Sequence, residues 1–388
     1  MISDQPNDWS SSYSVNGTSY SSAQTLNLTN GVNTNINIDV IPGSTASISS
    51  YTLTMTMASD PNAVQTQKVY VISGITDLIV NGSGGNGAGS GNGAVDYEGE
   101  FIDGLIHANN TAYGSTEATV MNLLNSNSAL SGVNNIYYNI GWTFPSLADA
   151  DANALMSFMD NGGNLFIAGQ DIGWDIESGS GYGTATTQNF YSNYMNASYI
   201  DDGNTANSQY TAVTTDPVFG NTSNTSIVDA YGGYMYPDEI NPINGAYAIF
   251  NYNGNTNKVG AIRFENANYK MVYIGVSLEM IGDVNIKNEI VKTSHDWFYG
   301  SISSSEVDFN ELISVYPNPA TNVLHINGST EFDEYSIYNI LGKVVKAGNL
   351  DQLSNTNQID ISTLPNGNYN MVINKNNGTK NLKFVVNK

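Results

Sequence analysis

The sequence predicts an α/β domain flanked by two all-β modules, and three observations support this. Between residues 74 and 300, short apolar segments alternate with amphipathic helical segments. Residues 1–73 and 306–388 show only strand-like alternation, broken by Gly, Pro and Asn turns. A small polar segment at 301–305 separates the last two regions. We therefore expect a three-layer α/β sheet domain, an N-terminal β-sandwich fragment, a linker and a small C-terminal β-sandwich.

The composition excludes several classes of function. The 388 residues contain no cysteine, so disulfides, thiolate metal sites and cysteine nucleophiles are ruled out. The chain has 12 Lys and Arg against 35 Asp and Glu, a formal charge of −23 that repels nucleic acid and anionic membranes. It has no apolar run of about eighteen residues, so we expect no transmembrane helix.

Residues 1–73 predict an immunoglobulin-like module. Thr-, Ser- and Asn-rich runs at 34–40, 51–57 and 68–72 alternate in period two, and turn residues bound each run. The first residues have neither the basic nor the apolar region of a signal peptide. We expect a truncated sandwich whose natural N-terminus lies upstream. Because so short a module buries little apolar surface by itself, we expect it to pack against the next domain.

The middle region predicts a parallel sheet with helices on both faces. The expected strands are 77–80, 136–140, 164–168, 246–250, 258–263 and 271–276, and the expected helices are 97–108, 116–124, 148–159 and 285–298. Asn161-Gly162-Gly163 gives the third helix a good C-cap, and a strand follows at once. Such alternation implies right-handed crossovers.

Two segments of this region resemble the class I glutamine-amidotransferase-like fold, a flavodoxin-like α/β domain. They are 161–172 (NGGNLFIAGQDI) and 273–279 (YIGVSLE). The resemblance implies a Cys nucleophile in the turn after the central strand, with a His and a Glu on a late strand. Here the turn offers Gln170, no His occupies the late strand, and only Glu279 matches. We therefore expect no amidotransferase or cysteine hydrolase activity.

Polar side chains follow the strand 164–168, where parallel sheets bind ligands. The candidate ligand-binding residues are Gln170, Asp171, Trp174, Asp175 and Glu279, and Glu177 lies beside them in sequence. Carboxylates, an amide and an exposed Trp suit a sugar, or a carboxylate-bound cation such as Ca²⁺. A structural role stays open, in which Asp171 caps a loop and Trp174 seals the sheet edge.

Two classes of function therefore remain. In the first, which we favour, the protein is a non-catalytic module that binds a glycan, a protein or a neighbouring catalytic domain. In the second, it is an extracellular hydrolase of glycans or peptides. That enzyme would pair Asp171 or Asp175 with Glu279 across about 5–10 Å.

The remaining motifs are weaker. Gly82 to Gly87 fits G-x-G-x-x-G, but the surrounding loop is so rich in glycine that the spacing carries little weight. His107, His295 and His325 are scattered and lack metal-ligand spacing. The run 201–204 (DDGN) could hold calcium but lacks the spacing of an EF-hand loop, so we expect a turn.

The C-terminal region carries several motifs in a fixed order. Turns of the Pro-Asn-Pro, Leu-Gly-Lys and Pro-Asn-Gly types separate short apolar strands, and the marker residues are Tyr316, Pro317, Asn318, Pro319, Gly342, Lys343, Gly367 and Tyr369. This series resembles the type A C-terminal sorting domain of the type 9 secretion system of Bacteroidetes. The resemblance implies recognition by the outer-membrane translocon and a sortase, and a secreted or outer-membrane cell-surface location.

Overall fold

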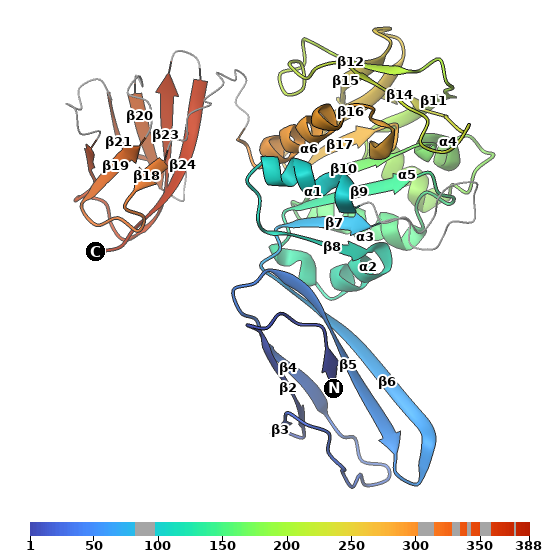
Figure 1. Cartoon of the computed structure of the whole chain (residues 1–388), viewed down its shortest axis with the longest axis vertical. Helices are drawn as coiled ribbons and strands as arrows, with labels where there is room; N and C mark the ends of the chain where they lie inside the picture. Colours follow the sequence, from blue (N-terminus) through green and yellow to red (C-terminus); the bar gives the residue numbers. More distant parts are fainter. Residues whose placement is uncertain (82–97, 302–313, 328–333, 340–342, 350–357, 376–377) are drawn as a thin grey trace. The chain divides into compact units, whose positions relative to one another are not determined.

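In the computed structural model of the chain, the structure describes residues 1–81, 98–301, 314–327, 334–339, 343–349, 358–375 and 378–388. Two compact units are present, Met1–His295 and Asp296–Lys388. The first contains the N-terminal strands and the α/β sheet, and the second contains the C-terminal strands (Figure 1). The glycine-rich loop with the G-x-G-x-x-G spacing and the expected linker after Ser301 lie outside the described residues.

The N-terminal strands form two three-stranded antiparallel sheets. The strands are β1 (Ile2–Ser3), β2 (Ser10–Val15), β3 (Thr18–Tyr20), β4 (Ile36–Ile41), β5 (Ser47–Met57) and β6 (Asp60–Ser73). One sheet has the order β1-β5-β6 and the other β3-β2-β4. Their shared core is small, with Tyr13, Val15 and Leu53 at its centre. Tyr70 and Ile72 of β6 pack instead against the core of the α/β sheet, as a module with so little apolar burial requires.

Five parallel strands form one half of the α/β sheet, in the order β8-β7-β9-β10-β17 (Figure 1). They are β7 (Asp77–Asn81), β8 (Tyr113–Glu117), β9 (Asn135–Gly141), β10 (Asn164–Gly169) and β17 (Lys270–Ile274). Numbered along the chain, this is the 2-1-3-4-5 order of flavodoxin-like sheets. Of these strands, β8 was not among those predicted.

The other half of the sheet is antiparallel, so the expectation of a parallel sheet is wrong for these strands. It contains β11 (Ala197–Asp202), β12 (Gln209–Ala212), β13 (Thr225–Ser226), β14 (Asp238–Pro242), β15 (Tyr247–Tyr252) and β16 (Val259–Glu265). β16 pairs antiparallel with both β15 and β17. The physical reason is the length of the connections: only a turn around Asn253-Gly254 joins β15 to β16, and a parallel crossover needs about a dozen residues.

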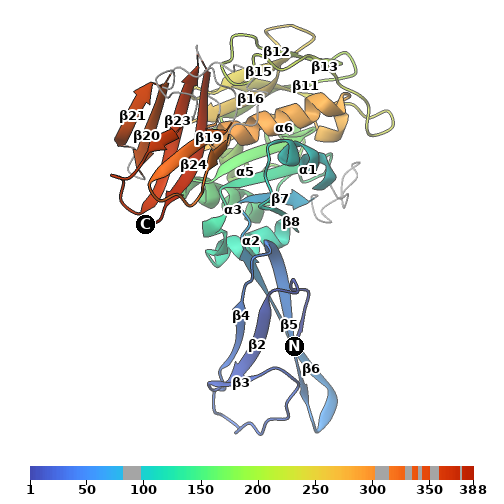
Figure 2. The ribbon, with the colours of Figure 1, turned by 60° about the vertical axis from the view of Figure 1, so that its left-hand side comes forward.

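Helices cover both faces of this sheet (Figures 1 and 2). They are α1 (Glu98–His107), α2 (Ala118–Ser126), α3 (Asp149–Asp160), α4 (Ile172–Glu177), α5 (Ala185–Asn193) and α6 (Val284–Phe298), with 3₁₀ turns η1 (Ala129–Gly132) and η2 (Leu278–Met280). The end of α3 follows from the sequence: Gly162 has φ +91°, and a Cβ on Gly163 would meet the Phe158 ring. The short α4 and α5 were not predicted.

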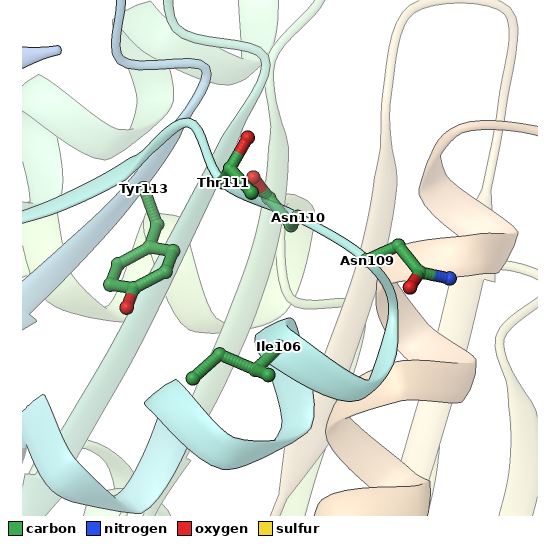
Figure 3. Close-up of a pocket in the computed structure, with 5 residues that line it drawn as sticks. All are labelled: Ile106, Asn109, Asn110, Thr111 and Tyr113. Atoms are coloured by element: carbon green, nitrogen blue, oxygen red, sulfur yellow. The ribbon is translucent and has the colours of Figure 1, made fainter. Parts of the chain in front are cut away.

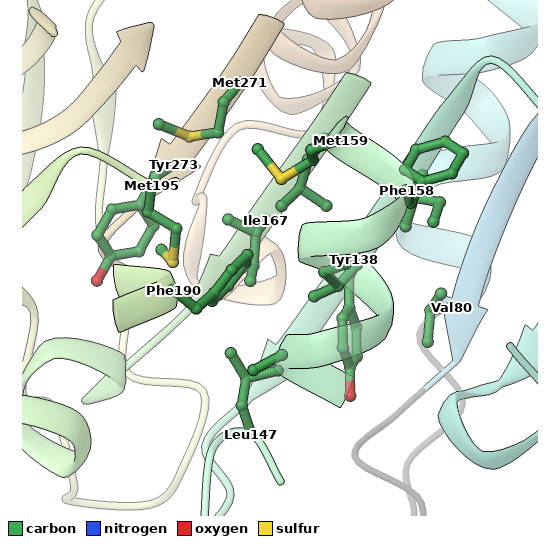
Figure 4. Packing of buried hydrophobic residues seen from close by; sticks show 14 of the residues in the cluster. Val80, Tyr138, Leu147, Phe158, Met159, Ile167, Phe190, Met195, Met271 and Tyr273 are labelled. Atoms are coloured by element: carbon green, nitrogen blue, oxygen red, sulfur yellow. The ribbon is translucent and has the colours of Figure 1, made fainter. Parts of the chain in front are cut away.

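The strand register decides which side chains meet which helices. Leu78, Ile136, Leu165 and Met271 lie opposite one another across four strands, on the face covered by α2, α3 and α5. Figure 4 shows this packing around Tyr138, Ile167 and Phe190. The alternate residues point to the other face, where Phe101 of α1 meets the rings of Tyr137 and Phe166.

The second unit is a small β-sandwich, as expected for the C-terminal region. Its strands are β18 (Ser314–Tyr316), β19 (Val323–Asn327), β20 (Glu334–Asn339), β21 (Val344–Asn349), β22 (Gln358–Asp360), β23 (Gly367–Lys375) and β24 (Gly378–Val386). They form the antiparallel sheets β18-β19-β22 and β21-β20-β23-β24. Leu324, Ile337, Met371 and Phe384 belong to the core between them. Of the marker residues, Gly342 lies outside the described ones.

Candidate binding face at the carboxyl end of the sheet

The turn after β10 contains a residue with a left-handed backbone. Asp171 has φ +62° and ψ +19°, directly before α4. Outside glycine, this conformation is best tolerated by Asn and Asp. A sharp turn from a strand into a helix is also the geometry that presents the nucleophile in α/β-hydrolases. The side chains around this turn determine whether a ligand could reach it.

Gln170 is fully buried and holds the segment that precedes β14. Its Oε1 accepts a hydrogen bond from the Tyr236 N–H at 2.8 Å, and its Nε2 donates to the Tyr234 carbonyl at 3.4 Å. Its own N–H donates to the Gly141 carbonyl at 2.9 Å. Both ends of the amide therefore bind backbone, and Gln170 has a structural role in this conformation.

Asp175 is buried as well. Its Oδ2 accepts hydrogen bonds from the Ser146 N–H at 2.7 Å and the Ser146 hydroxyl at 2.8 Å. Its Oδ1 accepts from the Tyr182 N–H at 2.9 Å. The carboxylate thus fastens the loop after β9 and the loop after α4 to each other. Because both oxygens are occupied, Asp175 orders these loops in the described structure.

Asp238, at the start of β14, occupies the first amides of α4. Its Oδ2 accepts hydrogen bonds from the Gly173 N–H at 2.6 Å and the Tyr273 hydroxyl at 3.1 Å. Trp174 N–H lies 3.4 Å from its Oδ1. Burial raises the pKa of Asp238 to about 7, although these hydrogen bonds oppose the shift. Two of the first amides of α4, those of Gly173 and Trp174, are therefore already bonded to a carboxyl group.

Asp171 itself is only 4% exposed. The Trp142 indole N–H donates to its Oδ2 at 2.6 Å. Burial, together with the nearby Asp238 and Asp202 carboxyl groups, raises the pKa of Asp171 to about 9. Asp171 is therefore closed off from solvent in this conformation, because an aromatic ring and neighbouring acids surround it. Trp174 is half-buried, with its ring 5.4 Å from that of Phe144.

Glu279 lies at the end of another strand, in the 3₁₀ turn after β17. Asn139 Nδ2 donates to its Oε2 at 2.7 Å, and the Tyr231 hydroxyl donates to its Oε1. Burial raises the pKa of Glu279, and these two hydrogen bonds oppose the shift. Within the described part of the chain, no hydrogen bond links Glu279 to Asp171 or Asp175.

Seven aromatic side chains cover this end of the sheet, and we call them the aromatic face. Trp142 is the central ring: its centroid lies 5.4 Å from that of Tyr231, 5.1 Å from Tyr234 and 6.2 Å from Tyr236. Phe144 extends the set, with the Tyr182 ring 6.5 Å away. The members are Trp142, Phe144, Trp174, Tyr182, Tyr231, Tyr234 and Tyr236.

The aromatic face has a buried layer and an exposed layer. Trp142 and Phe144 are 3% and 7% exposed, whereas Tyr182 is 58% and Tyr234 is 49% exposed. The exposed rings pack against buried rings. This packing limits the motion of the exposed rings and leaves part of their apolar surface accessible to solvent. Of its members, sequence reasoning identified only Trp174. The close spacing of Tyr231, Tyr234 and Tyr236 was the one sequence feature that pointed to an aromatic cluster. No local sequence pattern predicts that this segment packs against Gln170.

A separate open pocket, of about 560 Å³, lies where α1 leads into β8 (Figure 3). Ile106, Asn109, Asn110, Thr111 and Tyr113 line it. Because β8 begins here, the pocket lies at the amino edge of the parallel strands, opposite the end of β10. None of the predicted site residues lines it.

The described residues contain no group of three or more His, Asp or Glu side chains placed to hold a metal ion. The possible Ca²⁺ site at Asp171 therefore stays a prediction without geometric support. None of the helices in the described ranges has the length and apolarity needed to cross a membrane.

A family described as "Secretion system C-terminal sorting domain" matches residues 314–387. The match covers the β-sandwich of the second unit and confirms the type 9 sorting domain that its motifs predicted. The protein is therefore secreted or displayed at the cell surface, and it engages the type 9 secretion machinery. A comparison with curated proteins found no match for the chain.

Three of the solved structures that match this chain show a distant likeness. One is described as "mmIFT52 N-terminal domain", with a TM-score of 0.39, 10% identity, and coverage of 60% of this chain and 100% of that one. The exo-β-1,4-mannosidase Op5Man5 from Opitutaceae bacterium strain TAV5 has a TM-score of 0.35 and 10% identity over 60% of this chain. A β-galactosidase from Halorubrum lacusprofundi has a TM-score of 0.34 and 9% identity over 79%. This chain spans 37% and 40% of those two enzymes, and such scores carry no argument about function.

Proposed function

We propose that the first unit is a non-catalytic, glycan-binding module of a protein that the type 9 secretion system exports, and that the aromatic face binds the glycan. The observation that carries this proposal is the exposure of Tyr182 and Tyr234 above buried rings. The C–H-rich face of a sugar ring is apolar, so a fixed aromatic ring offers it a matching surface while hydroxyl groups stay in water. Exposed rings held in this way favour binding over a purely structural role.

The charge distribution selects the type of glycan. The chain carries a formal charge of −23, with 12 Lys and Arg against 35 Asp and Glu, so its surface is predominantly acidic. An anionic polysaccharide would be repelled from such a surface. The proposed ligand is therefore a neutral polysaccharide.

The way in which the turn after β10 is occupied supports the proposed lack of catalysis. Gln170 binds the backbone at 234–236, Asp238 binds the first amides of α4, and Asp171 is covered by Trp142. A nucleophile with a free oxyanion pocket would need these groups to be available. We further propose that this domain is a divergent amidotransferase-like domain without the catalytic residues. The 2-1-3-4-5 strand order and the left-handed turn residue support that proposal.

A carboxylate-based hydrolase is the second candidate, and one observation favours it. Burial raises the pKa of Asp171 to about 9, so this acid retains its proton near neutral pH and can serve as a general acid. Burial raises the pKa of Glu279 as well. The separation of their carboxyl groups would have to fall within about 5–10 Å for the expected pairing. This enzyme would also need the segment at 231–236 to move away from Gln170.

A glycan array tests the proposal directly. The full chain is screened beside Tyr182→Ala, Tyr234→Ala and the control Tyr316→Ala, which removes a 51% exposed tyrosine of the sorting domain. Removing one stacking ring should cost about 1 kcal/mol, roughly a fivefold loss of affinity. We expect neutral glycans to bind to the wild type and the control and to bind weakly to the other two variants. Equal binding by all four proteins would place the ligand elsewhere.

A further inference from the structure

We propose that Asp171 and Asp202 share one proton and that this acid pair positions Trp142, so that the order of the aromatic face depends on pH. The part of this inference that concerns ligand affinity rests on the proposed glycan binding. The pair itself, and its effect on Trp142, can be tested without any ligand.

The first observation is the geometry of Asp171. Its left-handed backbone fixes the carboxyl group beneath Trp142, where its Oδ2 accepts the indole N–H at 2.6 Å. The other oxygen, Oδ1, is buried and accepts no hydrogen bond from an N–H or hydroxyl group in the described residues. A buried carboxylate oxygen without a donor is costly, so this oxygen needs a partner.

Asp202, at the end of β11, supplies that partner. Its Oδ1 is also buried and also lacks a conventional donor within the described residues. Asp202 lies opposite Asp238 in the pairing of β11 with β14, and Asp238 accepts the N–H of Gly173, two residues after Asp171. The fold thus brings the two carboxyl groups within reach of each other, and we infer that each supplies the partner the other lacks. A hydrogen bond between two acids requires that one of them keeps its proton, because two carboxylates in contact repel. One proton therefore joins the turn after β10 to β11, two elements about thirty residues apart in the chain.

The groups around the pair favour retention of this proton. Asp238 on β14 lies near Asp171, and Asp201 precedes Asp202 on β11. The titratable groups near Asp238 include Tyr191 on α5, Tyr199 on β11, Tyr210 on β12, Tyr252 on β15 and Tyr273 on β17. Of the groups near the pair, Asp201 and Asp238 are the acids, and their field disfavours a second negative charge on the pair. Together with burial, this field raises the pKa of Asp171 to about 9 and raises that of Asp202 as well.

Loss of the proton would act on Trp142 first. Two adjacent anions would repel, Asp202 and Asp171 would move apart, and the Asp171 carboxylate would carry the bonded Trp142 indole out of its fixed position. Trp142 contacts Tyr231, Tyr234 and Tyr236, so the segment that carries the exposed Tyr234 would loosen with it. The proton thus stabilises the binding conformation below the alkaline range.

The test follows the near-UV circular dichroism of the full chain from pH 5 to pH 10. The variants are Asp202→Asn, Asp171→Asn, and Asp201→Asn as a control with the same loss of charge at an exposed neighbour on β11. Subtraction of a Trp142→Phe spectrum isolates the Trp142 signal from that of the other tryptophans. Wild type and Asp201→Asn should lose this signal in a transition near pH 9. Both pair variants should retain it, because the introduced amide donates its N–H to the remaining carboxylate.

Several results would overturn the proposal. One is an alkaline transition that survives unchanged in both Asp202→Asn and Asp171→Asn; another is its loss in Asp201→Asn. CaCl₂ that raises the melting temperature of the wild type but not of Asp202→Asn would show that the pair holds a cation instead of a proton. Where a neutral glycan binds, its affinity should fall over the same pH range in the wild type and in Asp201→Asn but not in the two pair variants. If no glycan binds, the spectral transition still decides the matter, so the two proposals can fail separately.

Discussion

Arg263 Nε donates to Asp216 Oδ2 at 2.7 Å, and both side chains are almost entirely buried, at 3% and 2% exposed. Arg263 projects from β16 in the antiparallel half of the sheet, and its guanidinium lies 4.8 Å from the centroid of the Tyr247 ring. The other oxygen of Asp216 accepts the N–H groups of Val218 at 3.0 Å and Phe219 at 2.8 Å. This ion pair fastens the loop after β12 to the sheet.

Replacement of Asp216 with Ala should lower the free energy of unfolding by about 3–5 kcal/mol, because it removes the buried carboxylate that neutralises the Arg263 guanidinium. Chemical denaturation measures the change. Glu265→Ala is the matched control: Glu265 also faces Arg263, at 3.6 Å, but it is 49% exposed. That change should cost less than about 1 kcal/mol. Equal effects of the two substitutions would mean that burial of the pair contributes little.

Replacing each of two glycines of α1 with alanine should change the stability of the protein in opposite directions. A Cβ on Gly104 would lie 2.5 Å from Val291 Cβ of α6, so Gly104→Ala should destabilise the protein by about 1–3 kcal/mol through overpacking. A Cβ on Gly99 would meet nothing within 4 Å, so Gly99→Ala should stabilise the helix by about 0.5–1 kcal/mol. Thermal unfolding of the two variants checks the signs. A stabilising Gly104→Ala would contradict the close packing of α1 on α6.

Stability should fall as the pH rises above the ordinary pKa of Glu279. Burial raises the pKa of this carboxyl group above 4.5, so the folded state binds its proton more tightly than the unfolded state does. The contribution of this bound proton to the free energy of unfolding is fully present below pH 4.5. It is lost as the pH rises through the higher pKa of Glu279 in the folded state. Glu279→Gln mimics the protonated acid and should flatten this slope in denaturation curves between pH 4 and 8. An unchanged slope would show that Glu279 titrates normally.

The sorting domain should be sufficient for delivery. Residues 306–388, fused behind a signal peptide and a reporter, should bring the reporter to the surface of a bacterium with a type 9 system. Ile337→Asp places a charge in the fully buried core of the sandwich and should abolish delivery by unfolding the domain. Surface proteolysis of the reporter distinguishes display from retention. Periplasmic retention of the unaltered fusion would refute this role.

Much of the parallel half of the sheet could be predicted, because its signals are local. The helix expected at 148–159 is observed at 149–160, and the strand after its Gly-Gly cap runs from 164 to 169. The sorting domain was likewise predictable from its ordered turn motifs. Strand direction in the other half was missed, although Asn253-Gly254 was a hairpin signal that the sequence contained.

The candidate site was only partly predictable, because its contacts join distant segments. Asp175 bonds Ser146, Gln170 bonds Tyr236, and Gly173 bonds Asp238, over separations of 29 to 66 residues. The sequence placed polar residues at the end of β10 but could not show that other loops bury them. The pairing of Asp171 with Asp202 is the clearest example. Asp171 follows β10 and Asp202 ends β11, and only the fold brings the two residues together.

The most direct test is an isothermal titration of the full chain with a neutral oligosaccharide chosen from the array, followed by mass analysis of the recovered sugar. Binding through the aromatic face, without catalysis, predicts saturable heat in the wild type, its loss in the Tyr182→Ala/Tyr234→Ala double variant, and recovery of the sugar intact. Turnover that disappears in both Asp171→Asn and Glu279→Gln would contradict this and would establish the hydrolase.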